Sequence, residues 1–269
     1  MDQMNYDIYK LRKWIYIDYA LLSRNPKAIY LLEHNLDKVE WYWLSSNPNA
    51  ITLLEQNKEN INWDQLSFNP NAINLLEQNF DKINWNYLSR NPNAIHLLEK
   101  NNDKIDWDEL SLNPNAIHLL KQNFNKINWN YLSRNPNAIH LLEQNFNKID
   151  WLELSQNPNA ISLLEQNIDK INWCFIVVNP NAINLIEQNL DKINQNMLSG
   201  NPNAIHLIEQ HKGKIFMPLL LKNPNIFERD YIKMSIMRTR IILEDLMKNV
   251  LHPRRISKFL ELGGDMDYF

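Results

Sequence analysis

Four histidines recur at one position of a repeating pattern and are the first candidates for metal chemistry. His96, His118 and His140 follow one another at intervals of 22 residues, and His206 lies further along in the same register. Imidazole ligands bind Zn²⁺ at about 2.0–2.1 Å, so they must converge on one point. Neighbouring units of a helical array lie about 8–10 Å apart, and no cysteine or carboxylate shares this column. We therefore predict solvated histidines, no metal site and no cofactor.

A column of lysines points to a second kind of chemistry, the binding of nucleic acid. Lys82, Lys104 and Lys126 exemplify a lysine that recurs every 22 residues. An aspartate usually precedes this lysine, and a glutamate recurs in the same units, so most of the charge is cancelled. The whole chain has a formal net charge of −3. Since release of counter-ions requires a positive surface, nucleic-acid binding is an alternative that the charge balance does not favour.

One local basic cluster stands apart from the columns. Arg254, Arg255 and Lys258 follow Pro253, which can start a short helix, and helical spacing would bring the three side chains near one another. The cluster is a candidate basic contact. Its alternative is an ordinary solvated face.

Nothing in the sequence predicts an enzyme. No Ser/His/Asp arrangement, carboxylate pair or phosphate-binding loop stands out from the repeats, and the chain has four glycines. The single cysteine, Cys174, has apolar neighbours and no nearby base, and it cannot form an internal disulfide. No apolar run is long enough to cross a membrane. We expect a soluble intracellular protein with no catalytic activity and no membrane partner.

All these residues belong to a repeat of 22 residues. With the proline of each unit as position 0, the unit reads Pro-Asn-Ala-Ile-x-Leu-Leu-Glu-Gln-Asn-x-Asp-Lys-Ile-Asn-Trp-x-x-Leu-Ser-x-Asn. Each of ten prolines is preceded by asparagine. The prolines are Pro26, Pro48, Pro70, Pro92, Pro114, Pro136, Pro158, Pro180, Pro202 and Pro224. A fixed period of this length indicates a repeat protein.

Each unit predicts two short helices. Asparagine before proline is a favoured helix N-cap, so we expect a first helix to start at every proline. The asparagine at position 9, such as Asn101, should end this helix in the left-handed conformation. Asparagine or aspartate at position 14 should cap a second helix, which carries tryptophan and leucine at positions 15 and 18. Such short helices are unstable alone, so the tryptophan, isoleucine and leucine columns should be buried between stacked units.

The predicted fold is therefore an all-α protein, an α-solenoid of stacked helix–turn–helix repeats with N- and C-terminal caps. We expect an N-terminal capping half-repeat at 1–25, an array of about nine units at 26–225, and C-terminal capping helices at 226–269. Ten stacked units would form a body about 80–100 Å long. The alternative is a leucine-rich-repeat-like α/β solenoid, which has a similar period and an asparagine ladder. It would need apolar residues where this chain has Asn86 and Asn93.

Three positions vary while the rest of the unit stays fixed. Positions 16, 17 and 20 lie together on one face of the second helix, away from its predicted core. Tyrosine, tryptophan and arginine contribute most to protein interfaces, and several occur here. The alternative is that solvated positions simply drift. The predicted protein-binding residues are Trp43, Phe68, Tyr87, Arg90, Glu109, Tyr131, Arg134 and Glu153.

The units Asn-Pro-Asn-Ala-Ile-x-Leu-Leu-Glu-Gln-Asn and Asp-Lys-Ile-Asn-Trp-x-x-Leu-Ser resemble the short, 22-residue Asn-rich repeats that are abundant in proteins of mimivirus-like giant viruses. The closing stretch, Leu251 to Asp265, is similar to C-terminal segments of some of those proteins. The resemblance implies no settled activity. It implies a place in the cytoplasm of an infected host cell or in the virion.

The leading prediction is a non-enzymatic protein–protein interaction scaffold with an unknown host or viral partner. The alternatives are a nucleic-acid-binding solenoid and a self-assembling structural or virion protein. The oligomeric state and the identity of the partner do not follow from the sequence.

Overall fold

The computed structural model describes residues 9–11, 17–210, 215–229, 257–258 and 261. The chain divides into two units, one formed by Arg12–Ile226 and one by Met1–Leu11 with Phe227–Phe269. In the smaller unit, strand β1 (Tyr9–Leu11) pairs with strand β2 (Phe227–Arg229) in antiparallel fashion. Residues 227–229 were predicted to be helical and are instead a strand. Arg254 and Arg255 lie outside the described residues, and Lys258 is exposed.

The larger unit is a regular series of short helices, as the sequence predicts, and its described residues contain no strand. The first helices are α3 (Ile29–Glu33), α5 (Ile51–Gln56), α7 (Ile73–Glu77), α9 (Ile95–Lys100), α11 (Ile117–Gln122), α13 (Ile139–Glu143), α15 (Ile161–Glu165), α16 (Ile183–Glu187) and α17 (Ile205–Gln210). The second helices are α2 (Tyr19–Leu22), α4 (Trp41–Ser45), α6 (Trp63–Phe68), α8 (Trp85–Ser89), α10 (Trp107–Leu112), α12 (Trp129–Arg134), α14 (Trp151–Ser155) and α18 (Met217–Leu220).

Short 3₁₀ helices complete the units. Those that join a first helix to a second helix are η1 (Leu36–Lys38), η2 (Lys58–Asn60), η3 (Phe80–Lys82), η4 (Asn102–Lys104), η5 (Phe124–Lys126), η6 (Phe146–Lys148) and η7 (Ile168–Lys170). Two more replace a second helix, η8 (Ile176–Val178) and η9 (Gln195–Gly200), and η11 (Pro224–Ile226) follows α18.

The first helices do not begin at the prolines, so this prediction is wrong. In the unit of Pro92, helix α9 begins at Ile95, and its N-cap residue Ala94 makes no side-chain cap. The preceding residues form a turn, in which Asn91 Oδ1 accepts a hydrogen bond from the backbone N–H of Asn93 at 3.0 Å. Each unit therefore starts with a turn, and the asparagine before proline does not cap the first helix.

The asparagine before each proline forms a ladder of hydrogen bonds between neighbouring units. Asn91 is fully buried, and its Nδ2 donates to the carbonyl oxygens of Ser67 at 3.0 Å and Asn69 at 2.9 Å. The asparagine at position 1 adds a third bond, from Asn93 Nδ2 to the carbonyl oxygen of Pro70 at 2.9 Å. The same bonds recur in the other units. The ladder that the leucine-rich-repeat alternative required is present, although the units are helical.

The predicted cap at position 9 is correct in place but not in conformation, whereas the predicted cap at position 14 is correct in both. Helix α9 ends before Asn101, as predicted, but Asn101 has φ −133° and is not left-handed. Its Nδ2 instead donates to the carbonyl oxygen of Leu97 at 2.8 Å, so the side chain itself closes the helix. The cap at position 14 is confirmed, since Asp106 Oδ1 accepts from the backbone N–H of Glu109 at 3.0 Å.

The core consists of aliphatic columns. Ala94, Leu97, Leu98, Ile105 and Leu110 are buried, and their counterparts in the other regular units are buried too. The tryptophans are only half-buried, so the prediction that their column is buried is wrong. Six of these rings lie near the surface, where a lysine of the following unit covers them, as described below.

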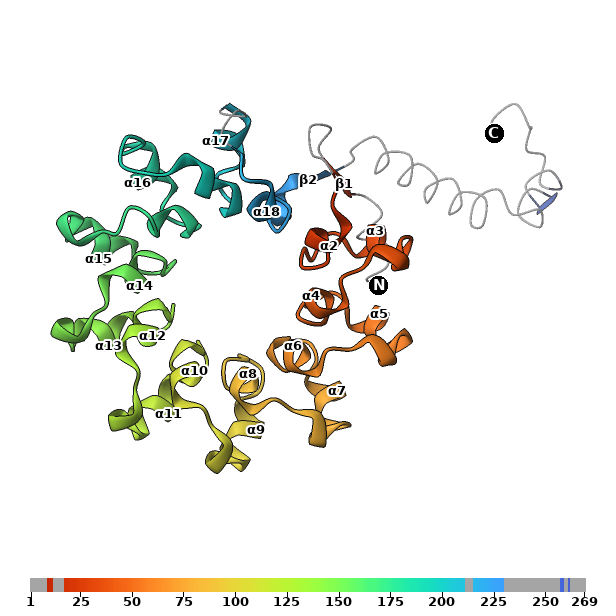
Figure 1. The fold of residues 1–269 in the computed structure, drawn as a ribbon, viewed down its shortest axis with the longest axis horizontal. Helices are drawn as coiled ribbons and strands as arrows, with labels where there is room; N and C mark the ends of the chain where they lie inside the picture. Colours follow the sequence, from red (N-terminus) through yellow and green to blue (C-terminus); the bar gives the residue numbers. More distant parts are fainter. Residues whose placement is uncertain (1–8, 12–16, 211–214, 230–256, 259–260, 262–269) are drawn as a thin grey trace. The chain divides into compact units, whose positions relative to one another are not determined.

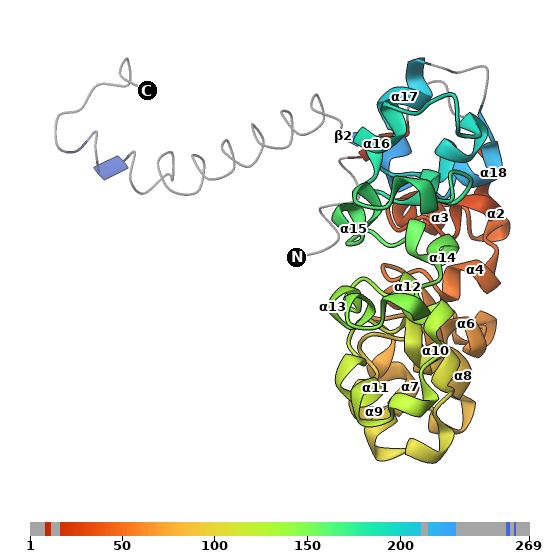
Figure 2. The same ribbon diagram turned by 90° about the vertical axis from the view of Figure 1, so that its left-hand side faces the viewer.

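The larger unit closes into a ring. Asn25 Nδ2 donates to the carbonyl oxygens of Leu221 at 3.1 Å and Asn223 at 3.0 Å, which are the ladder bonds that join any two successive units. Lys27 Nζ donates to Asn225 Oδ1 at 3.1 Å beside them. Figure 1 shows the closed path, and Figure 2 shows it from the side with α12–α15 in front. The predicted elongated body with two capped ends is therefore wrong for this unit.

Candidate binding surface

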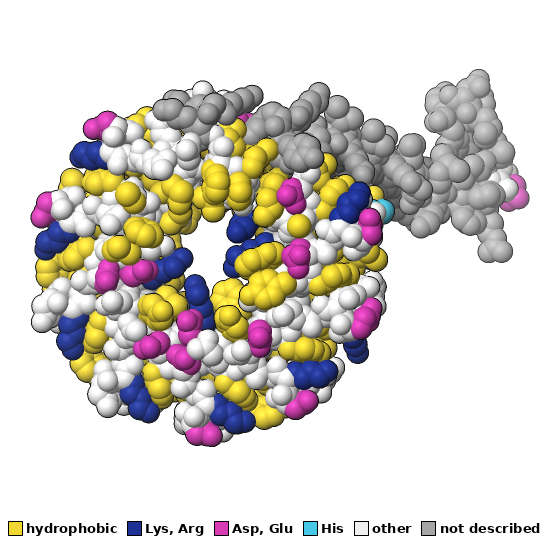
Figure 3. Space-filling view, in the orientation of Figure 1, with side chains coloured by type: hydrophobic (Ala, Val, Ile, Leu, Met, Phe, Trp, Pro, Cys, Tyr) yellow, Lys and Arg dark blue, Asp and Glu magenta, His cyan; other side chains and the backbone are white. Residues whose placement is uncertain are grey.

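The second helices form the inner wall of the ring, and the first helices form its outer wall (Figure 1). Figure 3 shows an opening through the middle, with lysine and arginine side chains at its edge. Positions 17 and 20 belong to the inner wall. Two of the three positions that the sequence singles out as variable, 17 and 20, thus surround the opening.

Side chains at position 20 of one unit meet position 17 of the next. The Arg24 guanidinium lies 4.7 Å from the ring centroid of Trp43, and Arg90 Nη1 lies 4.0 Å from Glu109 Oε2. Arg90 also lies over the ring of Phe68, at 5.2 Å from its centroid. The inner wall is therefore a continuous surface, in which charged and aromatic groups of successive units contact one another.

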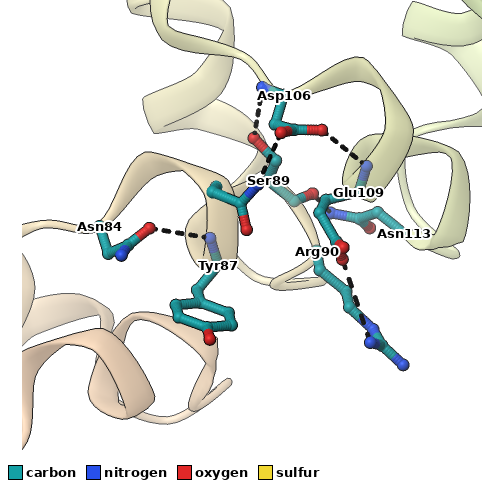
Figure 4. Close-up of polar contacts among 8 residues, drawn as sticks. Asn84, Tyr87, Ser89, Arg90, Asp106, Glu109 and Asn113 are labelled. Carbon is teal, nitrogen blue, oxygen red and sulfur yellow. Dashed lines mark hydrogen bonds and ion pairs between the residues drawn. The ribbon is translucent and has the colours of Figure 1, made fainter.

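The backbone beneath these groups is fixed by the conserved positions of the repeat (Figure 4). Asn84 Oδ1 accepts from the backbone N–H of Tyr87 at 3.2 Å and starts helix α8. Ser89 Oγ accepts from the backbone N–H of Asp106 at 3.0 Å and donates to the carbonyl oxygen of Trp85 at 2.8 Å. These bonds hold successive inner helices in register, so the variable side chains change on a constant frame.

The ion pair between Arg90 and Glu109 is partly withdrawn from water. Burial lowers the pKa of Arg90, Glu109 raises it, and the positive charges of Arg134 and Arg24 lower it further. Burial raises the pKa of Glu109, against the effect of Arg90. Arg24, Arg90 and Arg134 come from units that are not neighbours, yet Arg24 and Arg134 lie close enough to Arg90 to lower its pKa.

Two members of this group were missed by sequence reasoning. Arg24 was assigned to the N-terminal cap, and Lys222 lies where the repeat decays. Lys222 occupies position 20 of the unit of Pro202, and Arg24 occupies position 20 when the register is extended by one unit before Pro26. Lys222 Nζ lies 5.6 Å from the ring centroid of Trp43, so this ring has cations from two different units beside it. The 22-residue register could have identified both residues, because it places them at position 20.

The structure places the remaining predicted residues on the same wall with different exposure. Phe68, Tyr87 and Glu153 are half-buried, whereas Tyr131 and Arg134 are exposed. Glu153 Oε2 accepts a hydrogen bond from Gln156 Nε2 at 3.2 Å. The predicted residues thus form parts of one inner wall, and the contact between Arg90 and Glu109 is the ion pair formed among them.

Three of the four histidines contact a carboxylate of the preceding unit, whereas His140 Nδ1 lies 3.9 Å from Glu143 Oε2 of its own unit. His96 Nε2 lies 3.1 Å from Glu77 Oε1, and His118 Nε2 lies 3.0 Å from Glu99 Oε1. His206 forms the same contact with Glu187 at 2.8 Å. These carboxylates occupy position 7 of the neighbouring unit, so the histidine column by itself does not reveal them. In the described part of the chain, no three His, Cys, Asp or Glu side chains are grouped so that they could hold a metal ion.

The lysines stack on the tryptophans. Lys104 Nζ lies 4.6 Å from the ring centroid of Trp85 and 5.0 Å from that of Phe80, both in the preceding unit. Lys82, Lys126, Lys148, Lys170 and Lys192 cover Trp63, Trp107, Trp129, Trp151 and Trp173 in the same way. A cation over an indole face is attracted by its quadrupole, so this column links neighbouring units.

The fold and the inner wall define a ring-forming helical repeat protein. The sequence profile of the family described as periplasmic copper-binding protein (NosD) matches residues 21–231, and the chain belongs to this family. No curated protein and no solved structure matches the chain. No helix among the described residues has the length and apolar character needed to span a membrane.

The residues described by the structure do not fit a copper site. Copper is held by several imidazole or sulfur donors in a planar, tetrahedral or trigonal set. Each histidine column member, such as His118, offers one imidazole beside one carboxylate, and Cys174 is a single exposed thiol. No step of a copper-dependent function is therefore derived for this chain.

Proposed function

We propose that the protein is a non-enzymatic interaction scaffold that binds a protein partner on the inner wall of the ring. The observation that supports this proposal is that some positions of the repeat make the same structural contact in every unit, whereas others do not. The asparagine, serine, lysine and leucine columns each have a structural contact, as in the ladder bonds of Asn91 and the bridge of Ser89. The contacts at positions 17 and 20 differ from unit to unit, as in Arg24 over Trp43 and Arg90 beside Glu109. These positions carry tyrosine, tryptophan and arginine, which dominate interface energetics.

A pull-down with two charge-matched variants tests this placement. The inner variant combines Tyr87→Ala, Arg90→Ala, Tyr131→Ala and Arg134→Ala. The outer control combines Lys100→Ala, Lys121→Ala, His140→Ala and Gln144→Ala, four exposed residues in the outer helices or, for Gln144, directly after one. We expect the inner variant to lose partners that the outer control retains. Identical partner sets for both variants, with melting curves that show both to be folded, would contradict the inner wall as the contact surface.

Nucleic-acid binding is the second candidate. It is weakened because the lysine column covers tryptophan rings, as Lys126 covers Trp107 at 4.3 Å. A mobility shift of RNA or DNA that disappears with added salt would support it.

Self-assembly is the other alternative, and it required free ends of the stack. Asn25 bonds to Leu221 and Asn223 at the position where such an end would lie.

The partner and the location are proposals of the same kind. Following the resemblance to giant-virus repeat proteins, we place the partner among host or viral proteins, in the infected cell or the virion. The name of the family points instead to the periplasm. Fractionation of the native source followed by proximity labelling would separate the two locations and identify the neighbouring proteins.

A further inference from the structure

Four cations share one register on the wall of the opening. Arg24, Arg90, Arg134 and Lys222 all occupy position 20, which lies at the end of the inner helix of each unit. Arg24, Arg90 and Arg134 come from units that are not neighbours, whereas Lys222 belongs to the unit next to that of Arg24, where the ring closes. Figure 3 shows lysine and arginine side chains reaching the opening. Within the described part of the chain, one carboxylate lies within 4.0 Å of any of them, namely Glu109 beside Arg90. The wall thus carries more positive charge at position 20 than its own carboxylates neutralise.

Aromatic rings accompany these cations. Trp43 has Arg24 at 4.7 Å and Lys222 at 5.6 Å from its ring centroid, and Phe68 has Arg90 at 5.2 Å. Tyr131 and Phe175 are exposed at position 17 on the other side of the ring. A ligand in the opening would therefore meet cations that are flanked by apolar rings.

Carboxylates also face this wall, and they narrow the class of ligand. Glu109 and Glu153 occupy position 17, and Asp106 and Asp108 lie close enough to Glu109 to raise its pKa. A phosphodiester backbone repeats its negative charge at every nucleotide, so it would meet repulsion along this part of the wall. A polypeptide can place acidic side chains opposite the arginines and neutral or basic ones opposite the glutamates.

We infer that the opening of the ring binds an extended acidic polypeptide segment of the partner. Its carboxylates would bind Arg24, Arg134 and Lys222, and its apolar side chains would pack against Trp43 and Tyr131. This inference rests on the proposed function, because it specifies the chemistry of the partner at the same wall. Complementary charge across such a surface mainly sets specificity and the rate of association.

Fluorescence anisotropy on the full-length chain tests the inference. The probes are three labelled ligands of equal length: a peptide with glutamate at alternate positions, the same peptide with glutamine in place of glutamate, and oligo-dT. The test variant is Arg24→Gln with Arg134→Gln, which spares the Arg90–Glu109 pair. Its control is Lys100→Gln with Lys121→Gln, which changes the net charge equally on the outer helices.

We expect the acidic peptide to bind the wild-type protein and the control, and to bind the test variant about tenfold more weakly, as two lost ion pairs imply. The glutamine peptide should bind no better to the wild type than to the test variant. Equal affinity of the acidic peptide for both variants, or no binding at low salt, would overturn the inference. Tighter binding of oligo-dT, lost in the test variant, would also overturn it and assign the opening to nucleic acid.

The pull-down separates failure of this inference from failure of the proposed function. If partners are lost with the inner alanine variant but retained by Arg24→Gln with Arg134→Gln, the inner wall binds proteins by chemistry other than acidic recognition. If the inner alanine variant retains every partner, the scaffold proposal itself fails.

Discussion

At the scale of single residues, the asparagine before each proline shows what a sequence can and cannot reveal. Its invariance was visible, and a helix cap explains an asparagine before proline. A cap is also served by serine, threonine or aspartate, none of which occurs before any of the ten prolines. A ladder needs two N–H donors on one short side chain, which asparagine alone supplies. The exclusive use of asparagine at this position therefore indicated the ladder, but its hydrogen-bond partners lie in another unit and could not be identified from the sequence.

The ladder predicts a large cost for one substitution. Asn91→Ala removes two side-chain donors and leaves the buried carbonyl oxygens of Ser67 and Asn69 with one partner fewer. We expect a loss of about 2–4 kcal/mol in the free energy of unfolding, measured by urea denaturation. The control is Asn101→Ala, which loses one part-buried bond to Leu97 and should cost about 1 kcal/mol. Equal costs for the two variants would contradict the ladder.

The Glu109 carboxylate predicts a dependence of stability on pH. Its pKa in the folded state is raised by burial, so the contribution of this group is fully present below the ordinary glutamate value of about 4.3 and is lost as pH rises through the folded pKa. Glu109→Gln removes this titration. The stability of wild type relative to the variant should therefore fall as pH is raised from about 4 toward neutrality. Urea denaturation at several pH values measures the difference, and Glu55→Gln, an exposed glutamate, is the control. A difference that is constant or rises with pH would contradict the prediction.

At the scale of elements, helix content and the second cap were predictable because they depend on neighbours in sequence. Asp106 caps the helix that begins one residue later, and Leu110 lies one turn further along. The half-burial of the tryptophans was not predictable in this way. It depends on Lys104 of one unit meeting Trp85 of the previous unit, which requires the rotation between units. The inner wall also depends on this rotation. Its variable positions could be read from the sequence, but not the fact that they lie on the concave side.

The lysine column predicts a modest and chemically specific effect. Lys104→Gln removes the cation over Trp85 and Phe80 and should lower the free energy of unfolding by about 0.5–1 kcal/mol. Lys104→Arg should retain most of it, because a guanidinium also stacks on aromatic rings. Lys100→Gln removes the same charge from an exposed position and should change stability little. A loss in Lys104→Arg as large as that in Lys104→Gln would show that stacking is not the cause.

At the scale of the larger unit, closure is the feature that the sequence least reveals. Each unit turns by a small angle relative to the last, and that angle arises from packing rather than from any single residue. The number of units then decides whether an array ends or closes. Residues 17–25 are the second half of a unit and were predicted to cap an open end. In the structure they complete the ladder, because Asn25 donates to the unit that contains Leu221 and Asn223.

Closure makes a prediction about a residue at the start of the array. In an open array, Asn25 would lack the carbonyl partners that the preceding unit provides, and Asn25→Ala would be nearly neutral. In the ring, Asn25 is fully buried and bonds to Leu221 and Asn223. Asn25→Ala should therefore cost about as much as Asn91→Ala, about 2–4 kcal/mol by urea denaturation.

Hydrogen exchange provides the matching local measurement. Asn25→Ala should increase exchange at the backbone amides of residues 217–223, more than 190 positions away in sequence, whereas Asn101→Ala should not. Local opening is fastest where stabilising bonds have been lost, so the two ends of the array should loosen together. A cost as small as that of Asn101→Ala, with unchanged exchange in residues 217–223, would show that the ring is open. The acidic segment would then have an exposed groove rather than an enclosed opening to bind.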